Sequence, residues 1–445
     1  MTEISGNPVT IHIKTLGCKV NQYESDVIRG DWVKTGRLNT TADALPDMVI
    51  INTCSVTRKA ATQSRQMIRR AIRAHPGAVI IATGCLAQTE PGSLAKIEGI
   101  DYIIGNADKT KFPECLHNGL PVKNAEPVII RADISAQRIF GDSGFPATGA
   151  RSRPFIKIQD GCDQFCTYCI VPHARGPSRS RPMQSIADEI KFFGDKGCHE
   201  VVLTGIHIGR WGADFLPSMN LHQLLTHIHK NNLIPRVRLS SIEPIEITDA
   251  LLSFAVDSGS ICPHWHIPLQ SGDNGVLKKM NRPYSSEIFF ERIMQIHRLM
   301  PQAAIGTDVM VGFPGETDAA FEKTLALLKS MPVTYLHVFP FSRREPAPAA
   351  RFSDQVSPQK IKSRAATLTR LGLEKKAAFY EKMIGETVNV VIESRRDPAT
   401  GHLTGVSENY IRVLINGKDV LKNTTVKCRI VGRLSSLAVF GELTC

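Results

Sequence analysis

Residues Gly161–Cys169 read GCDQFCTYC and place three cysteines, Cys162, Cys166 and Cys169, on one short segment. The preceding run FIKIQDG alternates its side chains and ends in glycine, which predicts a short strand followed by a loop. Three thiolates this close in sequence can hold one soft metal centre from one side only. They suit a cubane [4Fe–4S] cluster in which three irons have cysteine ligands and the fourth has no protein ligand.

Two other interpretations of this loop stay open. His173 could complete a Cys3His set for structural zinc, although zinc sites usually bring their ligands as two separated pairs. The cysteines could also be unrelated buried thiols, which rarely cluster at such short intervals. The spacing resembles that of radical SAM (S-adenosylmethionine) enzymes, and this resemblance implies that SAM binds at the open iron.

Composition and charge narrow the class of protein. The chain has 445 residues, 42% of them hydrophobic, and lacks the apolar run of about 18 residues that would span a bilayer. With no secretory signal evident and eleven cysteines, we expect a cytoplasmic protein in a reducing compartment whose thiols bind metal. The formal net charge of +12 favours a polyanionic partner, most commonly nucleic acid.

Three further cysteines each follow a predicted strand. Cys18 follows IHIKTLG, Cys54 follows MVIINT and Cys85 follows AVIIATG, with helical stretches between them. This alternation predicts an open parallel α/β sheet. Because the carboxyl ends of its strands share one edge, where such folds bind ligands, we expect the three thiols to converge on a second cluster with a free iron. Three buried structural cysteines are the alternative.

The segments TLGCKVNQYES, INTCSVT and ATGCLAQ carry these three cysteines and resemble the cysteine motifs of the methylthiotransferase N-terminal domain. That family follows this domain with a radical SAM domain, as this chain does. The resemblance implies that the cluster of the 161–169 loop cleaves SAM to a 5′-deoxyadenosyl radical. It implies also that the second cluster presents methylated sulfur to the substrate radical. All six cysteines are thus candidate catalytic and metal-binding residues, whereas Cys115 is expected to be structural.

A barrel is predicted after the loop, with apolar strand candidates at 200–205, 236–241, 264–269, 305–313 and 335–341. Together with 155–160 they suit an incomplete (β/α)6 barrel, whose chemistry lies at the carboxyl ends of the strands. By resemblance, the motifs at these ends line the SAM and substrate pocket. The candidate SAM-binding residues are Thr204, Gly205, Glu243, Gln270, Ser271 and Asp308.

RNA binding is expected at two places. An arginine-rich stretch follows the cysteine loop, and guanidinium groups suit phosphate oxygens, with a solvated basic loop as the alternative. Residues 381–445 contain five short strand candidates that predict a small β-barrel and resemble the TRAM domain, an RNA-binding module. The RNA contact candidates are Arg175, Arg179, Arg181, Arg395, Arg396 and Arg433.

The expected fold class is therefore α/β. An N-terminal methylthiotransferase domain with an open parallel sheet occupies 1–122, a linker 123–147, a radical SAM barrel 148–380 and a TRAM-like β-barrel 381–445.

The motifs look most like those of the branch that adds a methylthio group to C2 of N6-threonylcarbamoyladenosine beside the anticodon, at position 37 of tRNA. This resemblance implies two [4Fe–4S] clusters, two SAM per turnover, and as partners the tRNA anticodon stem-loop, an external electron donor and a sulfur source, without a membrane. Isopentenyladenosine of tRNA and an aspartate of a ribosomal protein are alternative substrates. A non-catalytic, metal-stabilised RNA-binding protein is the alternative of another class.

Overall fold

The computed structural model describes residues 9–34, 45–111, 122–141, 144–146, 151–435 and 437–444. Cys115 lies outside them. Two compact units make up the chain, and each is assembled from separate segments. Unit 1 comprises Met1–Thr148, Gln159–Arg181 and Ser342–Ala350, and unit 2 comprises Gly149–Ile158, Pro182–Phe341 and Arg351–Cys445.

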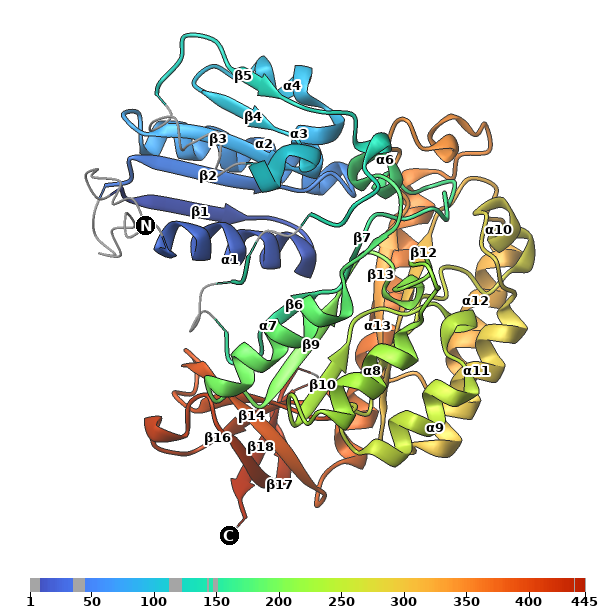
Figure 1. Cartoon of the computed structure of the whole chain (residues 1–445). Helices are drawn as coiled ribbons and strands as arrows, with labels where there is room; N and C mark the ends of the chain where they lie inside the picture. Colours follow the sequence, from blue (N-terminus) through green and yellow to red (C-terminus); the bar gives the residue numbers. More distant parts are fainter. Residues whose placement is uncertain are drawn as a thin grey trace. The chain divides into compact units, whose positions relative to one another are not determined.

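Unit 1 is built on a five-stranded parallel sheet in the order β1-β2-β3-β4-β5 (Figure 1). Its strands are β1 (Ile11–Thr15), β2 (Met48–Thr53), β3 (Val79–Gly84), β4 (Tyr102–Ile104) and β5 (Val128–Ile130). Its helices are α1 (Lys19–Lys34), α2 (Arg58–Ala74), α3 (Cys85–Thr89) and α4 (Pro91–Ala95), with 3-10 turns η1 (Asn106–Lys111) and η2 (Ile134–Ala136). The predicted open parallel α/β sheet is confirmed.

Both faces of this sheet are covered, which explains why the first four residues of β2 and of β3 are all apolar. Val49 and Ile51 of β2 pack in one cluster with Ile68 of α2. Met48 and Ile50, which point to the opposite face, pack with α1. Burial on both faces is the condition under which parallel strands form.

One strand was not expected. β5 lies in the segment 123–147, expected to be a linker, and pairs in parallel with β4. Its three residues, Val128–Ile130, are apolar but largely exposed, and the run is shorter than the buried apolar runs of β2 and β3. Pairing with the open edge of β4 is what orders it.

The other segments of unit 1 surround the cysteine loop. They form β7 (Gln159–Asp160), α6 (Val171–Arg175), β8 (Arg179–Ser180) and the start of η5 (Pro348–Arg351). The expected strand 155–160 is divided, because β6 joins the barrel of unit 2 while β7 pairs antiparallel with β8. The backbone N–H of Ala349 donates to the Thr167 carbonyl at 2.8 Å, so 342–350 packs against the loop.

Unit 2 contains the predicted partial (β/α)6 barrel. Two three-stranded parallel sheets, β6-β9-β10 and β11-β12-β13, are joined by a bridge between Val237 and Ile261. The strands are β6 (Phe155–Lys157), β9 (Glu200–Thr204), β10 (Arg236–Leu239), β11 (His264–His266), β12 (Ala304–Val311) and β13 (Tyr335–Pro340). The helices are α7 (Met183–Asp195), α8 (Leu221–Lys230), α9 (Asp249–Ser258), α10 (Asn274–Lys279), α11 (Ser286–Leu299) and α12 (Asp318–Ser330), with turns η3 (Ile208–Arg210) and η4 (Pro244–Glu246).

A long helix, α13 (Pro358–Lys382), connects this barrel to a second, closed barrel of order β14-β15-β16-β18-β17 (Figure 1). Its strands are β14 (Thr387–Arg396), β15 (Leu403–Ser407), β16 (Arg412–Ile415), β17 (Thr425–Arg433) and β18 (Val439–Leu443), with turn η6 (Asp419–Leu421). Closure pairs every strand on both sides, so no sheet edge is left open. The predicted small β-barrel is confirmed.

A buried ion network joins the two barrels of unit 2. Glu200 of β9 pairs with Arg236 and Arg238 of β10. Arg238 also donates to the carbonyls of Ser407 at 2.9 Å and Glu408 at 3.0 Å. Since Arg238 and Glu200 are almost fully buried, the network fixes how the closed barrel sits on the strands.

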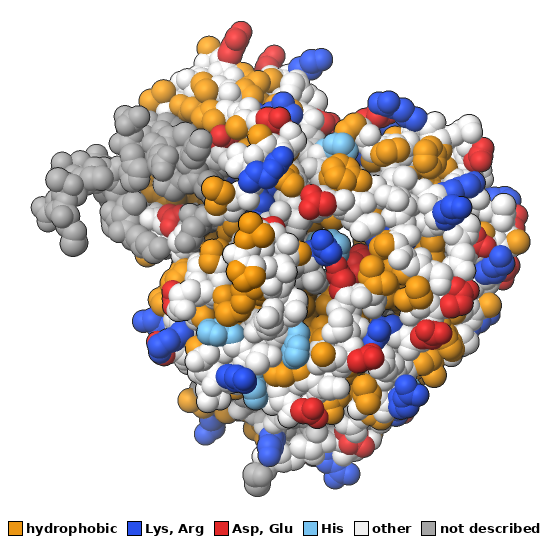
Figure 2. Space-filling view, turned by 45° about the vertical axis from the view of Figure 1, so that its right-hand side comes forward, with side chains coloured by type: hydrophobic (Ala, Val, Ile, Leu, Met, Phe, Trp, Pro, Cys, Tyr) orange, Lys and Arg blue, Asp and Glu red, His pale blue; other side chains and the backbone are white. Residues whose placement is uncertain are grey.

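The surface carries charges of both signs. Figure 2 shows Lys and Arg side chains interspersed with Asp and Glu on the face in view. None of the helices formed by the described residues is long and apolar enough to cross a lipid bilayer.

Candidate metal centres and cofactor site

Cys18, Cys54 and Cys85 lie where three neighbouring strands end. Cys18 comes between β1 and α1, Cys54 follows β2, and Cys85 is the first residue of α3. A thiolate charge on Cys85 raises the pKa of both Cys18 and Cys54, which places Cys85 close to both. The three cysteines, separated in sequence, therefore converge at one edge of the sheet.

The surroundings of these thiols disfavour a free thiolate. Burial raises the pKa of Cys54 to about 12, and the neighbouring Cys85 adds to the rise. Desolvation by the surrounding protein likewise raises the pKa of Cys18, although its side chain remains accessible to solvent and Arg175 opposes the rise. A bound cation would stabilise the deprotonated sulfurs, because metal ligation replaces the thiol proton. These residues are thus suited to hold a metal centre.

Backbone hydrogen bonds shape the loop that carries the other three cysteines. The Cys162 N–H donates to the Gly176 carbonyl at 3.0 Å, and the Cys169 N–H donates to the Cys166 carbonyl at 2.9 Å. Gly161 has a φ of +73°, and a Cβ there would lie 1.9 Å from the Pro177 carbonyl oxygen. Only glycine fits that position. The three sulfurs are thereby presented from a fixed loop.

The zinc interpretation of this loop requires His173 as the fourth ligand. The ring of His173 lies against the edge of Phe165, with ring centroids 6.2 Å apart.

Arg175 connects the cysteine loop to the sheet edge. Its guanidinium is 1% exposed and forms ion pairs with Glu24 at 2.8 Å and with Asp160 at 3.1 Å. It also donates to Oδ1 of Asn21 at 2.5 Å. Glu24 in turn pairs with Lys109 at 2.5 Å. The burial cost of these charges is offset by their mutual pairing.

Arg179 and Arg181 are buried as well, which corrects the expectation that this stretch contacts RNA. Arg179 donates to the carbonyls of Arg175 and Pro177, and Arg181 donates to the Tyr23 hydroxyl at 3.2 Å. Guanidinium groups enclosed by protein acceptors cannot bind phosphate without breaking these bonds. The three arginines order the loop instead.

The partners of Arg175 were not predicted from the sequence. Asn21 and Glu24 lie one turn into the helix that follows Cys18, and Lys109 lies in η1. The positions of Asn21 and Glu24 shortly after the first cysteine were visible, but nothing local indicates that they meet an arginine 154 and 151 residues away. Asn106 was missed too; its Nδ2 lies 3.7 Å from the Cys85 sulfur and donates to the Ala174 carbonyl at 2.8 Å.

In unit 2, several candidate SAM-binding residues lie at carboxyl ends of barrel strands. Thr204 is the last residue of β9, and Gly205 follows it. Gln270 has a φ of +65°, which is uncommon for a residue with a side chain. Its backbone is held by Asp308 and Met310 of β12. Held strain of this kind clusters at ligand sites.

Other candidates already have protein partners. Glu243 forms an ion pair with Arg282, although burial raises the pKa of Glu243 more than that pair lowers it. The hydroxyl of Ser271, almost fully buried, lies 3.4 Å from that of Thr324. Burial alone would raise the pKa of Asp308, but hydrogen bonds from two histidines, His266 and His337, outweigh it and hold that pKa below its usual range. Asp308 is therefore engaged by imidazoles.

The RNA candidates of the closed barrel differ in availability. Arg395 is exposed on β14. Arg396 pairs with Asp419 at 2.6 Å, and Arg433 pairs with Glu381 at 3.3 Å. Exposed pairs of this kind are weak, so both remain accessible to a polyanion.

Two protein-family models match the chain. The Radical SAM superfamily model matches residues 156–328, and the model described as Uncharacterized protein family UPF0004 matches residues 10–105. Together they cover the two regions that carry the cysteine triads.

Named relatives match nearly the whole chain. Threonylcarbamoyladenosine tRNA methylthiotransferase MtaB of Bacillus subtilis (strain 168) is 36% identical over 425 residues, covering 95% of this chain and 94% of that protein. The tRNA-2-methylthio-N(6)-dimethylallyladenosine synthase of Salinispora arenicola (strain CNS-205) is 32% identical, covering 91% of this chain and 81% of that protein. Among solved structures, the radical S-adenosylmethionine methyltransferase TsrM from Kitasatospora setae has a similar fold, with a TM-score of 0.55 at 16% identity over 77% of each chain.

Proposed function

The chain belongs to the methylthiotransferase family of radical SAM enzymes, and we propose that it attaches a methylthio group to C2 of N6-threonylcarbamoyladenosine at position 37 of tRNA. The observation that carries this proposal is that both cysteine triads lie in unit 1, where Arg175 ties the loop of one to the sheet edge of the other. The family implies SAM and a [4Fe–4S] cluster. We propose two clusters and two SAM per turnover.

In this proposal each triad has its own task. Cys162, Cys166 and Cys169 hold the cluster that supplies reductive cleavage of SAM, and with it a radical able to remove hydrogen from an unactivated carbon. Cys18, Cys54 and Cys85 hold the cluster from which sulfur is delivered. The proposed SAM-binding residues are Thr204, Gly205, Glu243, Gln270 and Ser271; the sixth candidate, Asp308, is engaged by His266 and His337. An external electron donor and a sulfur source complete the reaction.

Two observations support threonylcarbamoyladenosine of tRNA as the substrate. The relative from Bacillus subtilis, 36% identical to this chain, is named for threonylcarbamoyladenosine, whereas the relatives named for dimethylallyladenosine are 30 to 32% identical. A tRNA substrate also agrees with the net charge of +12 and with exposed Arg395 on the closed barrel.

Mass spectrometry of tRNA nucleosides from a deletion strain tests the substrate. Loss of 2-methylthio-N6-threonylcarbamoyladenosine, restored by the wild-type gene, supports the proposal. Loss of the isopentenyladenosine product instead, or no change in either nucleoside, refutes it.

The division of labour is tested in vitro with anaerobically purified protein. Cys162→Ala is expected to abolish SAM cleavage, whereas Cys54→Ala is expected to keep SAM cleavage and lose methylthiolation. Cys198→Ala is the matched control, since Cys198 lies outside both triads and should leave both reactions and about eight irons per chain, four for each cluster, unchanged. Retention of SAM cleavage in Cys162→Ala would refute the assignment.

A further inference from the structure

Three side chains on adjacent strands converge inside the barrel of unit 2. His266 ends β11, Asp308 lies on β12 and His337 on β13, where it is the direct register partner of Asp308. Oδ1 of Asp308 lies 2.8 Å from Nε2 of His266 and 3.3 Å from Nδ1 of His337. All three ligand atoms lie within 4.8 Å of one another.

Side chains alternate in direction along each strand, so this polar group lies on the opposite face of the sheet from the hydrophobic core. Trp265, Ile305 and Val309 point to the opposite side and are buried in the hydrophobic core with the surrounding helices. Because neighbours in a strand point to opposite faces, His266 and Asp308 point into the barrel instead. The polar group is thus set apart from the core by the geometry of the sheet.

We propose that His266, Asp308 and His337 bind a divalent first-row transition metal ion such as Fe²⁺ or Zn²⁺. Ligand atoms on a metal with bonds of about 2.1 Å lie about 3.0 Å apart at right angles and about 3.4 Å apart in a tetrahedron, and the two separations from Oδ1 of Asp308 are 2.8 and 3.3 Å. Two imidazoles and one carboxylate are the ligand set of open, three-residue metal sites. No step of the proposed methylthiotransfer uses this site.

Tyr335 orients the first of these ligands. Its hydroxyl lies 3.1 Å from Nδ1 of His266 and 2.8 Å from Nε2 of His264. A bound metal would take the place of the Nε2 proton that His266 shares with Asp308, while Nδ1–H of His266 donates to the Tyr335 hydroxyl and that hydroxyl donates to His264. Metal-binding histidines commonly have such an outer hydrogen bond. Gly306 makes room for the tyrosine, because a Cβ there would lie 2.0 Å from its ring.

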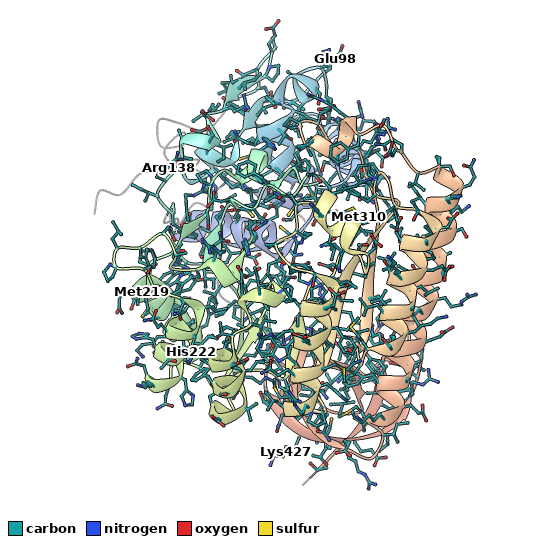
Figure 3. All side chains as sticks on the ribbon, turned by 90° about the vertical axis from the view of Figure 1, so that its right-hand side faces the viewer. Glu98, Arg138, Met219, His222, Met310 and Lys427 are labelled. Atoms are coloured by element: carbon teal, nitrogen blue, oxygen red, sulfur yellow. The ribbon has the colours of Figure 1, made fainter. Side chains whose placement is uncertain are left out.

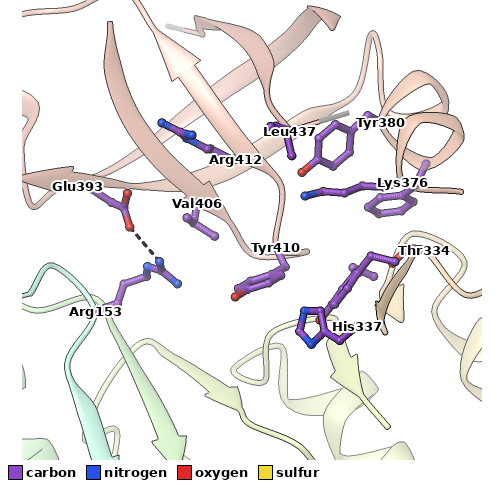
Figure 4. Close-up of a pocket in the computed structure, with 13 residues that line it drawn as sticks. Arg153, Thr334, His337, Lys376, Tyr380, Glu393, Val406, Tyr410, Arg412 and Leu437 are labelled. Atoms are coloured by element: carbon purple, nitrogen blue, oxygen red, sulfur yellow. Dashed lines mark hydrogen bonds and ion pairs between the residues drawn. The ribbon is translucent and has the colours of Figure 1, made fainter. Parts of the chain in front are cut away.

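The site opens toward a pocket. The His337 side chain is 54% exposed, and it lines a cavity of about 420 Å³ at the junction with the closed barrel (Figure 4). Arg153, Glu393, Lys376 and Arg412 also line this cavity, and Arg153 pairs with Glu393 at 3.0 Å. Cationic side chains outnumber the carboxylate in this lining, which favours an anionic oxygen donor, such as a carboxylate or a phosphate, as the further ligand on the metal.

Mn²⁺ binding to the full-length, cluster-loaded protein without tRNA tests the proposal. Mn²⁺ prefers oxygen and nitrogen ligands to thiolates, so it avoids the cysteine sites, and its free form is counted by electron paramagnetic resonance. The wild type is expected to bind one equivalent that Zn²⁺ displaces and that His337→Gln lacks. Gln can still hydrogen-bond Asp308, which protects the fold. Tyr335→Phe is expected to weaken binding roughly 10- to 100-fold.

His222→Gln is the matched control, since His222 lies on α8, one of the outer helices, against Phe254 (Figure 3). It should bind Mn²⁺ as the wild type does. Iron and sulfide contents are measured for every variant, so a loss of clusters is recognised. Equal Mn²⁺ binding by the wild type and His337→Gln, or an equal loss in His222→Gln, would overturn the proposal. His266, Asp308 and His337 would then form hydrogen bonds with one another and bind no metal.

Discussion

Arg175 holds together charges that cannot be left alone in a protein interior. Replacing it by methionine leaves Glu24 and Asp160 without their shared partner. Breaking one side of a buried pair typically costs about 3–5 kcal/mol. We therefore expect Arg175→Met to lower the free energy of unfolding of unit 1 by that amount and to reduce iron content. Denaturant titration and iron analysis measure both.

Arg175→Lys distinguishes the contribution of the positive charge from that of the forked shape of the guanidinium. Arg175→Lys keeps a positive charge but loses the fork that reaches Asn21, Glu24 and Asp160 together, so an intermediate loss is expected. Arg138→Met, at an exposed arginine (Figure 3), should change neither quantity. Wild-type stability in Arg175→Met would contradict this account.

Glu200 makes the stability of unit 2 depend on pH. Burial would raise its pKa, but Arg238 and Arg236 lower it from 4.5 to about 2. A carboxyl whose pKa is lower in the folded chain stabilises it above pH 4.5, and this contribution is lost as pH falls toward 2. The shift corresponds to roughly 3 kcal/mol at pH 7.

Glu200→Gln is therefore expected to lower the free energy of unfolding at pH 7 by about 3 kcal/mol, and to make it less sensitive to pH below 4.5. Urea titrations followed by the fluorescence of Trp211 and Trp265, both buried in unit 2, measure this. Parallel curves for the wild type and the variant between pH 5 and 3 would exclude Glu200 as the titrating group.

At the scale of elements, the turn from β3 into α3 controls where Cys85 lies. Gly84 has a φ of +96°, and a Cβ there would lie 2.5 Å from both Oδ1 of Asn52 and the Thr53 carbonyl oxygen. Gly84→Ala should displace Cys85 and, with the two proposed four-iron clusters, lower the iron content from about eight to about four per chain. Gly77→Ala is the control, because a Cβ at Gly77 meets no atom within 4 Å. Full iron loading of Gly84→Ala would contradict this prediction.

The strands of unit 1 show which elements could be predicted from sequence patterns and which could not. β2 and β3 were predictable because burial on both faces demands continuous apolar runs. β5 was not, since its apolar run is only three residues long and lies in a segment without other strand signals, where it pairs with β4. The cysteines of the site could be found from their motifs. The burial of Arg175 could not, because its partners Asn21 and Glu24 come from a distant helix.

For the whole molecule, the expected binding of nucleic acid predicts how the affinity for tRNA depends on salt concentration. Removing one side chain that binds a phosphate should lower the slope of log affinity against log salt by about 1. Arg395→Ala should weaken tRNA binding and lower this slope, since its side chain is exposed on β14. Arg396→Ala should have a smaller effect, because Arg396 already pairs with Asp419. Filter binding over a range of salt concentrations measures both, and an unchanged slope in Arg395→Ala would remove it from the RNA interface.

The segmented make-up of unit 1 has a consequence for biosynthesis. Its last segment, Ser342–Ala350, contributes the ion pair of Arg344 with Glu90 and the bond from Ala349 to the cysteine loop. A ribosome must translate residue 350 before unit 1, which begins at the N-terminus, has all of its segments. Unit 1, which carries both cysteine triads, is therefore complete only late in translation, and a fragment ending before residue 342 lacks these interactions.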